Sequence, residues 1–152
     1  MTTDSSDALP FVDEHRVLAP APVPAVWRAL ARQVPGAGGG GALARLLGAE
    51  PRHAAGRLFD PGATLPGFAV AEAVPGRSVR LTGRHRFSRY ALVLTLTARP
   101  GGTVLSARTY AEFPGLPGRL YRLLVIGSGA HRVLVARMLR TVRRRAARDA
   151  AD

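Results

Sequence analysis

The sequence predicts an α+β protein in which an antiparallel β-sheet packs against a long C-terminal helix. Two patterns indicate this class: strand-like segments separated by turn residues fill positions 67 to 113, and an amphipathic stretch follows from about Leu116 to Arg148. A chain of 152 residues, 47% of them hydrophobic, has the size and composition of one globular domain. We therefore expect a disordered tail over residues 1–10, a single domain over 11–148 and a frayed end over 149–152.

The N-terminal part of the domain reads as one strand followed by two short helices. Residues Phe11 to Leu18 show mixed alternation and contain β-formers, and the proline-rich segment APAPVP ends them with a turn. Pro24 fits a first helical turn, and an apolar stripe at helical spacing follows it until Pro35-Gly36, made of Val23, Val26, Trp27, Leu30 and Val34. A second short helix is expected from Ala42 to Leu47, before Gly48.

An antiparallel meander is expected next. Strands are predicted over 67–74, 78–87, 90–98 and 103–113, with turns at Pro75-Gly76, Ser88-Arg89 and Pro100-Gly101-Gly102. In the third of these strands the side chains of Tyr90, Leu92, Leu94 and Leu96 alternate with smaller ones. This alternation is typical of a sheet with one buried face, so the leucine face is expected to be the buried one.

The last predicted element is an amphipathic helix lying on the sheet. Its apolar side is made of Leu134, Val135, Met138, Leu139, Val142 and Ala146, and its other side carries Arg137, Arg140, Arg144 and Arg148. Gly127 and Gly129 interrupt it, and a glycine weakens a helix interior by about 1 kcal/mol relative to alanine. A kink or a close approach of another backbone is therefore expected there.

The composition excludes some functions and weakens others. The sequence has no cysteine, which excludes disulfides, thiolate catalysis and cysteine-ligated metal centres. The net charge is +12, but every basic residue is arginine and the charge is spread along the chain, so we interpret it as a solvated surface and not as a nucleic-acid site. The charge is clustered at one place, formed by Arg143, Arg144, Arg145 and Arg148. Peripheral contact of this cluster with a membrane is therefore kept as a hypothesis.

No export signal or membrane-spanning segment is predicted. The N-terminus MTTDSSDALP has acidic and hydroxyl residues where a secretion signal has a basic start and an apolar run. The most apolar stretch, Leu120 to Ala136, is interrupted by arginine, glycine and histidine, and it falls short of the roughly 20 apolar residues that span a bilayer. We therefore expect a cytoplasmic protein.

The order of these elements resembles the helix-grip arrangement of the START-like superfamily, also called SRPBCC proteins. VLAPAPVPAVWRAL is similar to the family's opening strand, proline turn and first helix, and GRHRFSRYALVLTL with PGGTVLSARTYAEFPG is similar to its central hairpin. The segment GRLYRLLVIGSGAHRVLVARMLRTVRRRA resembles the final helix of uncharacterised bacterial members. The resemblance implies a cavity between the concave face of the sheet and the final helix, able to hold a lipid, a polyketide or a similar hydrophobic ligand.

The candidates for lining such a cavity are His85, Phe87, Tyr90, Leu92, Leu94, Tyr121, Leu124, His131, Leu134 and Met138. His131 lies on the helix face expected to meet the sheet, and His85 alternates with apolar residues of its strand. Either imidazole can orient a ligand carbonyl or transfer a proton, or it can be hydrogen-bonded in the core. Tyr90 and Tyr121 can likewise line the cavity or serve as packing residues. No residue pattern predicts a metal site, a phosphate-binding loop or a cofactor.

The leading hypothesis is a protein that binds a small hydrophobic molecule through the shape of a cavity and a few polar groups. One alternative is an enzyme of the polyketide cyclase or dehydratase type, which would use His85, His131 or Tyr90 as acid or base. That alternative predicts that the two histidines lie within reach of each other. The other alternative is electrostatic binding of an anionic membrane or a nucleic acid through the C-terminal arginines.

Overall fold

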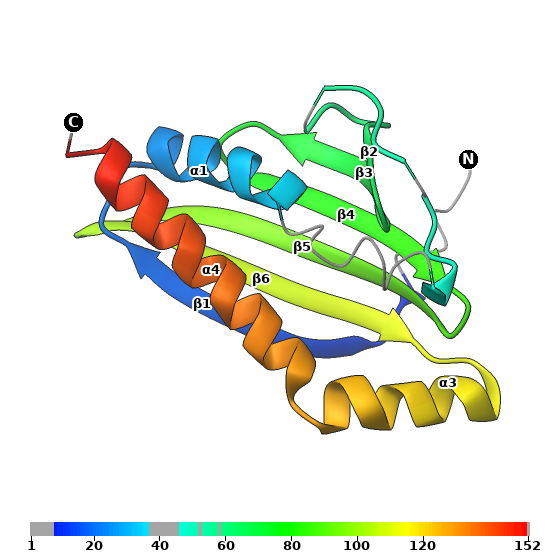
Figure 1. Cartoon of the computed structure of the whole chain (residues 1–152). Coiled ribbons are helices and arrows are strands. Elements are labelled where there is room, and N and C mark those ends of the chain that lie inside the picture. Colours follow the sequence, from blue (N-terminus) through cyan, green and yellow to red (C-terminus); the bar gives the residue numbers. More distant parts are fainter. Residues whose placement is uncertain (1–7, 37–45, 52, 58, 152) are drawn as a thin grey trace.

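The computed structural model describes residues 8–36, 46–51, 53–57 and 59–151, which form an antiparallel sheet with helices on one face (Figure 1). In chain order the elements are β1 (Phe11–Ala19), α1 (Val23–Gly36), β2 (Thr64–Leu65), β3 (Phe68–Val74), β4 (Ser78–His85), β5 (Ser88–Arg99), β6 (Gly102–Glu112), α3 (Gly115–Arg122), the π-helix η2 (Leu123–Gly127) and α4 (Ala130–Asp149). The strands lie in the order β1-β6-β5-β4-β3-β2. The predicted α+β class, the meander and the helix-grip arrangement are confirmed.

The sheet buries one face, as the alternation in the sequence predicts. On β5, Leu94 and Leu96 are buried, whereas Thr97 and Arg99 are exposed. On the neighbouring β6, Leu105 and Ala107 are fully buried on the same side. The period of two along each strand therefore separates a concave inner face, which the helices cover, from an outer face.

The core lies between this inner face and the helices α1 and α4 (Figure 1). The side chains that fill it are at most 2% exposed and come from every layer: Val26 and Leu30 of α1, Leu81, Leu94 and Leu105 of the sheet, and Leu139 and Val142 of α4. Trp27 also packs here, with its ring 4.9 Å from the ring of Phe59. Burial of each large apolar side chain contributes about 1.5–3 kcal/mol, so this layer dominates the stability of the fold.

The first helix matches its prediction, because α1 spans Val23–Gly36. Of the second predicted helix, Leu46 and Leu47 are helical, and residues 42–45 lie outside the described part of the chain. Most of the expected N-terminal tail, residues 1–7, also lies outside it. Leu9 is buried, and the amide of Ala111 donates a hydrogen bond of 2.9 Å to the carbonyl of Pro10, so contact with the sheet begins before Phe11.

The turn between β4 and β5 lies two residues earlier than predicted. His85 pairs with Ser88, so Arg86 and Phe87 form the turn and the predicted position at Ser88-Arg89 is wrong. A side chain helps this turn form without glycine, because the amide of Phe87 donates a hydrogen bond of 3.1 Å to Nδ1 of His85. The two-residue strand β2 was not predicted, since it is too short to show a period.

The predicted C-terminal helix is broken into two segments. Gly129, with φ of +78°, adopts the left-handed conformation that favours glycine, and it separates η2 from α4. The kink was therefore predicted at the right place but is a complete break. The buried stripe of α4 is Val135, Leu139, Val142 and Ala146. Leu134, predicted on the same side, is 66% exposed, and its inward position was wrong because the stripe that meets the sheet begins one residue later.

No helix in the described ranges is both long enough and apolar enough to cross a lipid bilayer.

Replacing Leu139 by alanine is expected to lower the free energy of unfolding by about 2–5 kcal/mol, because it removes a side chain that is 2% exposed and leaves a cavity. Leu134→Ala, on the same helix, is the matched control and should change it by less than about 0.5 kcal/mol. Urea denaturation followed by tryptophan fluorescence measures both. Similar losses in the two variants would contradict the orientation of α4.

Candidate functional site

Aromatic side chains gather on the concave face at the hairpin between β4 and β5. The ring of His85 lies 4.7 Å from that of Tyr121 and 5.6 Å from that of Tyr90, and Phe87 stacks on Tyr121 at 5.7 Å. These four residues, which we call the aromatic cluster, come from β4, the hairpin turn, β5 and α3. Each of them is only half-buried. The structure therefore brings together four of the residues that the sequence singled out.

Tyr90 is fixed by two glycines. Its hydroxyl donates a hydrogen bond of 2.6 Å to the carbonyl of Gly67, and its ring lies across Gly83. A Cβ atom at Gly83 would lie 2.0 Å from the Gly67 carbonyl oxygen and 2.7 Å from the Tyr90 ring, so only glycine fits there. Burial, with a smaller contribution from Tyr121, raises the pKa of Tyr90 to about 12. The phenol is therefore protonated at neutral pH, and its proton is engaged by Gly67.

His85 is held as a neutral hydrogen-bond donor. Its Nδ1 accepts the amide hydrogen of Phe87, so in the neutral ring the proton is on Nε2. Burial lowers the pKa of His85 below its ordinary value of 6.5, which keeps the ring neutral at physiological pH. The ring can therefore donate one hydrogen bond through Nε2 to a ligand oxygen.

A second, polar group lies on the same face, between β1, β6 and the start of α4. Nε2 of His131 lies 3.1 Å from Oγ1 of Thr109 and 3.4 Å from Oδ1 of Asp13. The other carboxylate oxygen of Asp13 lies 3.3 Å from Nε2 of His15. We call these four residues the Asp13 cluster. A carboxylate beside an imidazole can orient the ring, and enzymes that use histidine as an acid or base employ this arrangement.

The two clusters are neighbours on the sheet, but their histidines are held apart. In the register of β5 and β6, Tyr90 is opposite Ala111 and Leu92 is opposite Thr109. Leu92 and Ala111 therefore lie between the aromatic cluster and the Asp13 cluster. The ring of His85 contacts that of Tyr121, and His131 contacts Thr109, so the two histidines have different partners. In the described part of the chain, no group of histidine and acidic side chains is arranged to hold a metal ion.

The remaining candidates have different positions. Leu92 and Met138 pack against the core, and Leu94 is fully buried within it. Leu124, like Leu134, points outward, with 65% of its surface exposed. The inward position predicted for Leu124 was wrong, because the side of the helical segment that meets the sheet carries Tyr121.

Sequence reasoning missed three members of the Asp13 cluster: Asp13, His15 and Thr109. A signal was present, since Asp13, His15, Val17 and Ala19 alternate along β1 and lie on its inner side. Asp13 and His15 therefore share a face with two apolar residues, which marks them as inward-facing polar groups.

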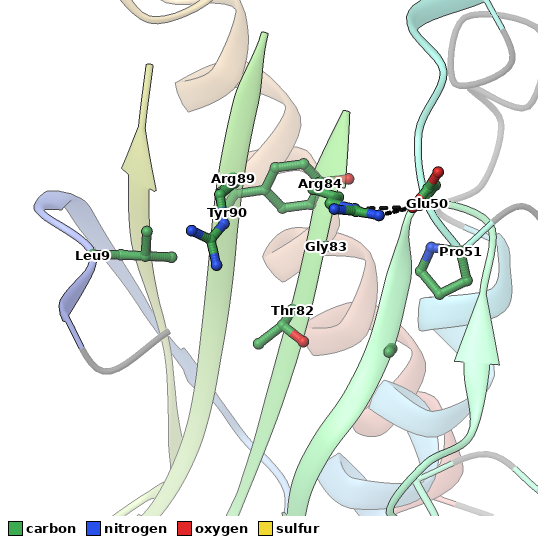
Figure 2. A pocket seen from close by; sticks show the side chains of 9 residues that line it. Leu9, Glu50, Pro51, Thr82, Gly83, Arg84, Arg89 and Tyr90 are labelled. Carbon is green, nitrogen blue, oxygen red and sulfur yellow. Dashed lines mark hydrogen bonds and ion pairs between the residues drawn. The ribbon is translucent and has the colours of Figure 1, made fainter. Parts of the chain in front are cut away.

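Two cavities of the described part of the chain include residues of the outer face of the sheet, and Tyr90 also lines the first of them. The cavity between the sheet and the C-terminal helix stays a prediction. The first, of about 380 Å³, lies beside the ion pair of Arg84 with Glu50, and Figure 2 shows the helices behind the strands that line it. The second, of about 400 Å³, lies over β1, β6 and β5. There the pKa of Glu14 is lowered to about 2 by hydrogen bonds from Arg16, Ser106 and Arg108. Both linings carry ion-paired arginines, and the first also includes the apolar residues Leu9, Pro51 and Ala69.

No family model matches the sequence, and no curated protein matches it. Solved structures do match. Protein CV1439 from Chromobacterium violaceum aligns with a TM-score of 0.54 and 17% identity, over 91% of this chain and 99% of that chain. MLL2253 from Mesorhizobium loti aligns with a TM-score of 0.54 and 15% identity, over 90% and 96% of the two chains. Ara h 8.0201 aligns with a TM-score of 0.51 and 12% identity, over 88% and 95%.

At these identities the likeness shows the fold alone. The chain is thus an α+β protein with the helix-grip fold, whose sheet and long C-terminal helix it shares with those structures.

Tyr90→Phe is expected to lower the free energy of unfolding by about 1–2 kcal/mol at neutral pH, because the carbonyl of Gly67 loses its partner. Below pH 10.0 the Tyr90 phenol is protonated in both the folded and the unfolded chain. Between pH 10.0 and about 12 only the unfolded chain loses this proton, so the free energy of unfolding falls over that interval. The unfolding free energy of the wild type should therefore fall more steeply over this interval than that of the variant. Urea denaturation at several pH values tests this, with Tyr110→Phe as control. Parallel curves for the wild type and Tyr90→Phe would show that Tyr90 is not buried as described.

Proposed function

We propose that the chain belongs to the START-like superfamily and binds a small hydrophobic molecule on the concave face, at the end covered by α3. The aromatic cluster carries this proposal. Three of its rings come from the hairpin between β4 and β5 and the fourth, Tyr121, from α3; they converge beside a packed core, and each is half-buried. Apolar and aromatic surface with a few polar groups is typical of small-molecule sites.

The polar groups of this face favour a ligand with an apolar body and an oxygen acceptor. His85 offers one donor inside the aromatic cluster, from a ring that is neutral at physiological pH. Thr109 and His131 offer further polar contacts beyond Leu92, one cross-strand position along the face. A lipid or a polyketide has this combination of apolar surface and sparse oxygens, which is why we favour that class.

Tyr121→Ala is expected to weaken binding of the neutral apolar probe N-phenyl-1-naphthylamine at least tenfold, about 1.4 kcal/mol. The variant removes the ring that contacts both His85 and Phe87. Fluorescence titration measures the affinity, and a neutral probe avoids attraction to the arginines.

The matched control for this titration is Tyr110→Ala. Tyr110 lies on the outer face, with its ring 5.8 Å from that of Phe11, so its removal should leave the affinity within about twofold. The proposal is contradicted if both variants bind the probe as the wild type does, or if the wild type shows no saturable binding.

A second candidate function, acid–base chemistry of the polyketide cyclase or dehydratase type, is favoured by the contact of His131 with Asp13. Native mass spectrometry of protein purified from its own host separates the two functions. An enzyme that has lost its acid or base should retain unreacted substrate, so His131→Gln would carry a molecule of different mass from that of the wild type. For a binding protein we expect one retained mass in the wild type, in His131→Gln and in the control His53→Gln, which changes an exposed histidine.

A further inference from the structure

We propose that the helical segment formed by α3 and η2 docks on the surface of an anionic lipid bilayer. Four leucines are exposed along it: Leu116 (77%), Leu120 (60%), Leu123 (68%) and Leu124 (65%). The other three follow Leu116 by four, seven and eight residues, a spacing that places all four on one side of a helix. We call them the leucine stripe.

The leucine stripe is not a surface that the fold itself buries. The opposite side of the same segment already meets the sheet, because Tyr121 packs on the rings of His85 and Phe87. Gly118 is also buried on that side, so close to the backbone of Phe113 that a Cβ atom would lie 2.6 Å from it. Figure 1 shows α3 at the end of the sheet, beyond β6, where its outer side faces away from the other elements.

The charge around the leucine stripe points to an anionic partner. Arg119, Arg122 and Arg132 are all exposed on this segment or just after it, and the sequence has no acidic residue between Glu112 and Asp149. The guanidinium of Arg122 is placed 5.9 Å from the centre of the Phe113 ring. A helix that combines an exposed apolar side with arginines lies well in the interface of a membrane with negatively charged headgroups.

A second copy of the chain fits the leucine stripe less well. A symmetric dimer through this stripe would bring the arginines of one copy close to those of the other, between chains that each carry a net charge of +12. The proposed surface also differs from the C-terminal arginines considered from the sequence. Arg143, Arg144 and Arg145 lie near the far end of α4, away from α3 (Figure 1).

Flotation with phosphatidylcholine vesicles, with and without phosphatidylglycerol, tests the proposal without any ligand. We expect the full chain to bind the anionic vesicles at least tenfold more strongly than the neutral ones. The triple variant Leu120→Ser, Leu123→Ser, Leu124→Ser should lose at least tenfold in this binding. Leu18→Ser with Val74→Ser, which changes exposed apolar residues of the strands, should bind as the wild type does.

A second measurement does not depend on the triple variant folding. The chain has no cysteine, so Leu123→Cys introduces a single thiol that can carry an environment-sensitive NBD fluorophore. Its emission should rise and shift to shorter wavelength when anionic vesicles are added, and the same label at Leu18→Cys should not respond.

Three results would overturn the proposal. One is vesicle binding that survives the leucine variant but is lost in Arg143→Gln, Arg144→Gln, Arg145→Gln, which would assign binding to the C-terminal arginines. Another is an absence of vesicle binding together with a dimer, seen by sedimentation velocity, that the leucine variant abolishes. The third is an NBD label at position 123 that does not respond to anionic vesicles. None of these results depends on the probe titration, so the failure of either proposal can be recognised separately.

Discussion

The burial of the concave face of the sheet by α1 and α4 is the interaction on which the rest of the structure depends. Leu94 and Leu105 of the sheet belong with Leu139 and Val142 of α4 to one buried core, and this core fixes where α4 crosses the strands. Because side chains of this size each contribute about 1.5–3 kcal/mol when buried, moving α4 along the sheet would forfeit more energy than any surface contact could restore. The positions of His131 and of α3 follow from that placement.

The same placement leaves one end of the sheet to α3. Figure 1 shows that α1 and α4 cover the part of the sheet far from the hairpin between β4 and β5, and there the inner face is packed with aliphatic side chains. Toward the hairpin the inner face carries the aromatic cluster, covered by Tyr121. Tyr90 can lie across the strands there because Gly83 has no side chain. Along the inner face of the sheet the side chains thus change from fully buried aliphatic ones to half-buried aromatic ones.

The break at Gly129 gives α3 and η2 two functional sides. In one continuous helix, the orientation that buries Val135, Leu139 and Val142 of α4 would also fix which side of α3 and η2 meets the sheet. With the break, α3 and η2 turn independently, so that Tyr121 meets the sheet and the leucine stripe faces outward. The proposed ligand site and the proposed membrane surface therefore lie on opposite sides of one short helical segment. A molecule leaving the aromatic cluster past α3 would emerge close to the docked bilayer.

The sequence by itself determined the class of fold, the buried face of β5 and the stripe of α1 from Val23 to Leu30, because periodicity shows which residues share a side of one element. The side chain of Val34, also predicted in that stripe, lies outside the described part of the structure. It also named His85, Phe87, Tyr90 and Tyr121 among ten candidates for lining one cavity, without showing which of the ten contact each other. It did not place Leu124 and Leu134 correctly or find the Asp13 cluster. Which side of a helix meets the sheet depends on the break at Gly129, and the approach of Asp13 to His131 depends on strand register and on the crossing of α4. These were decided only by the tertiary structure, because they arise from contacts between residues far apart in the chain.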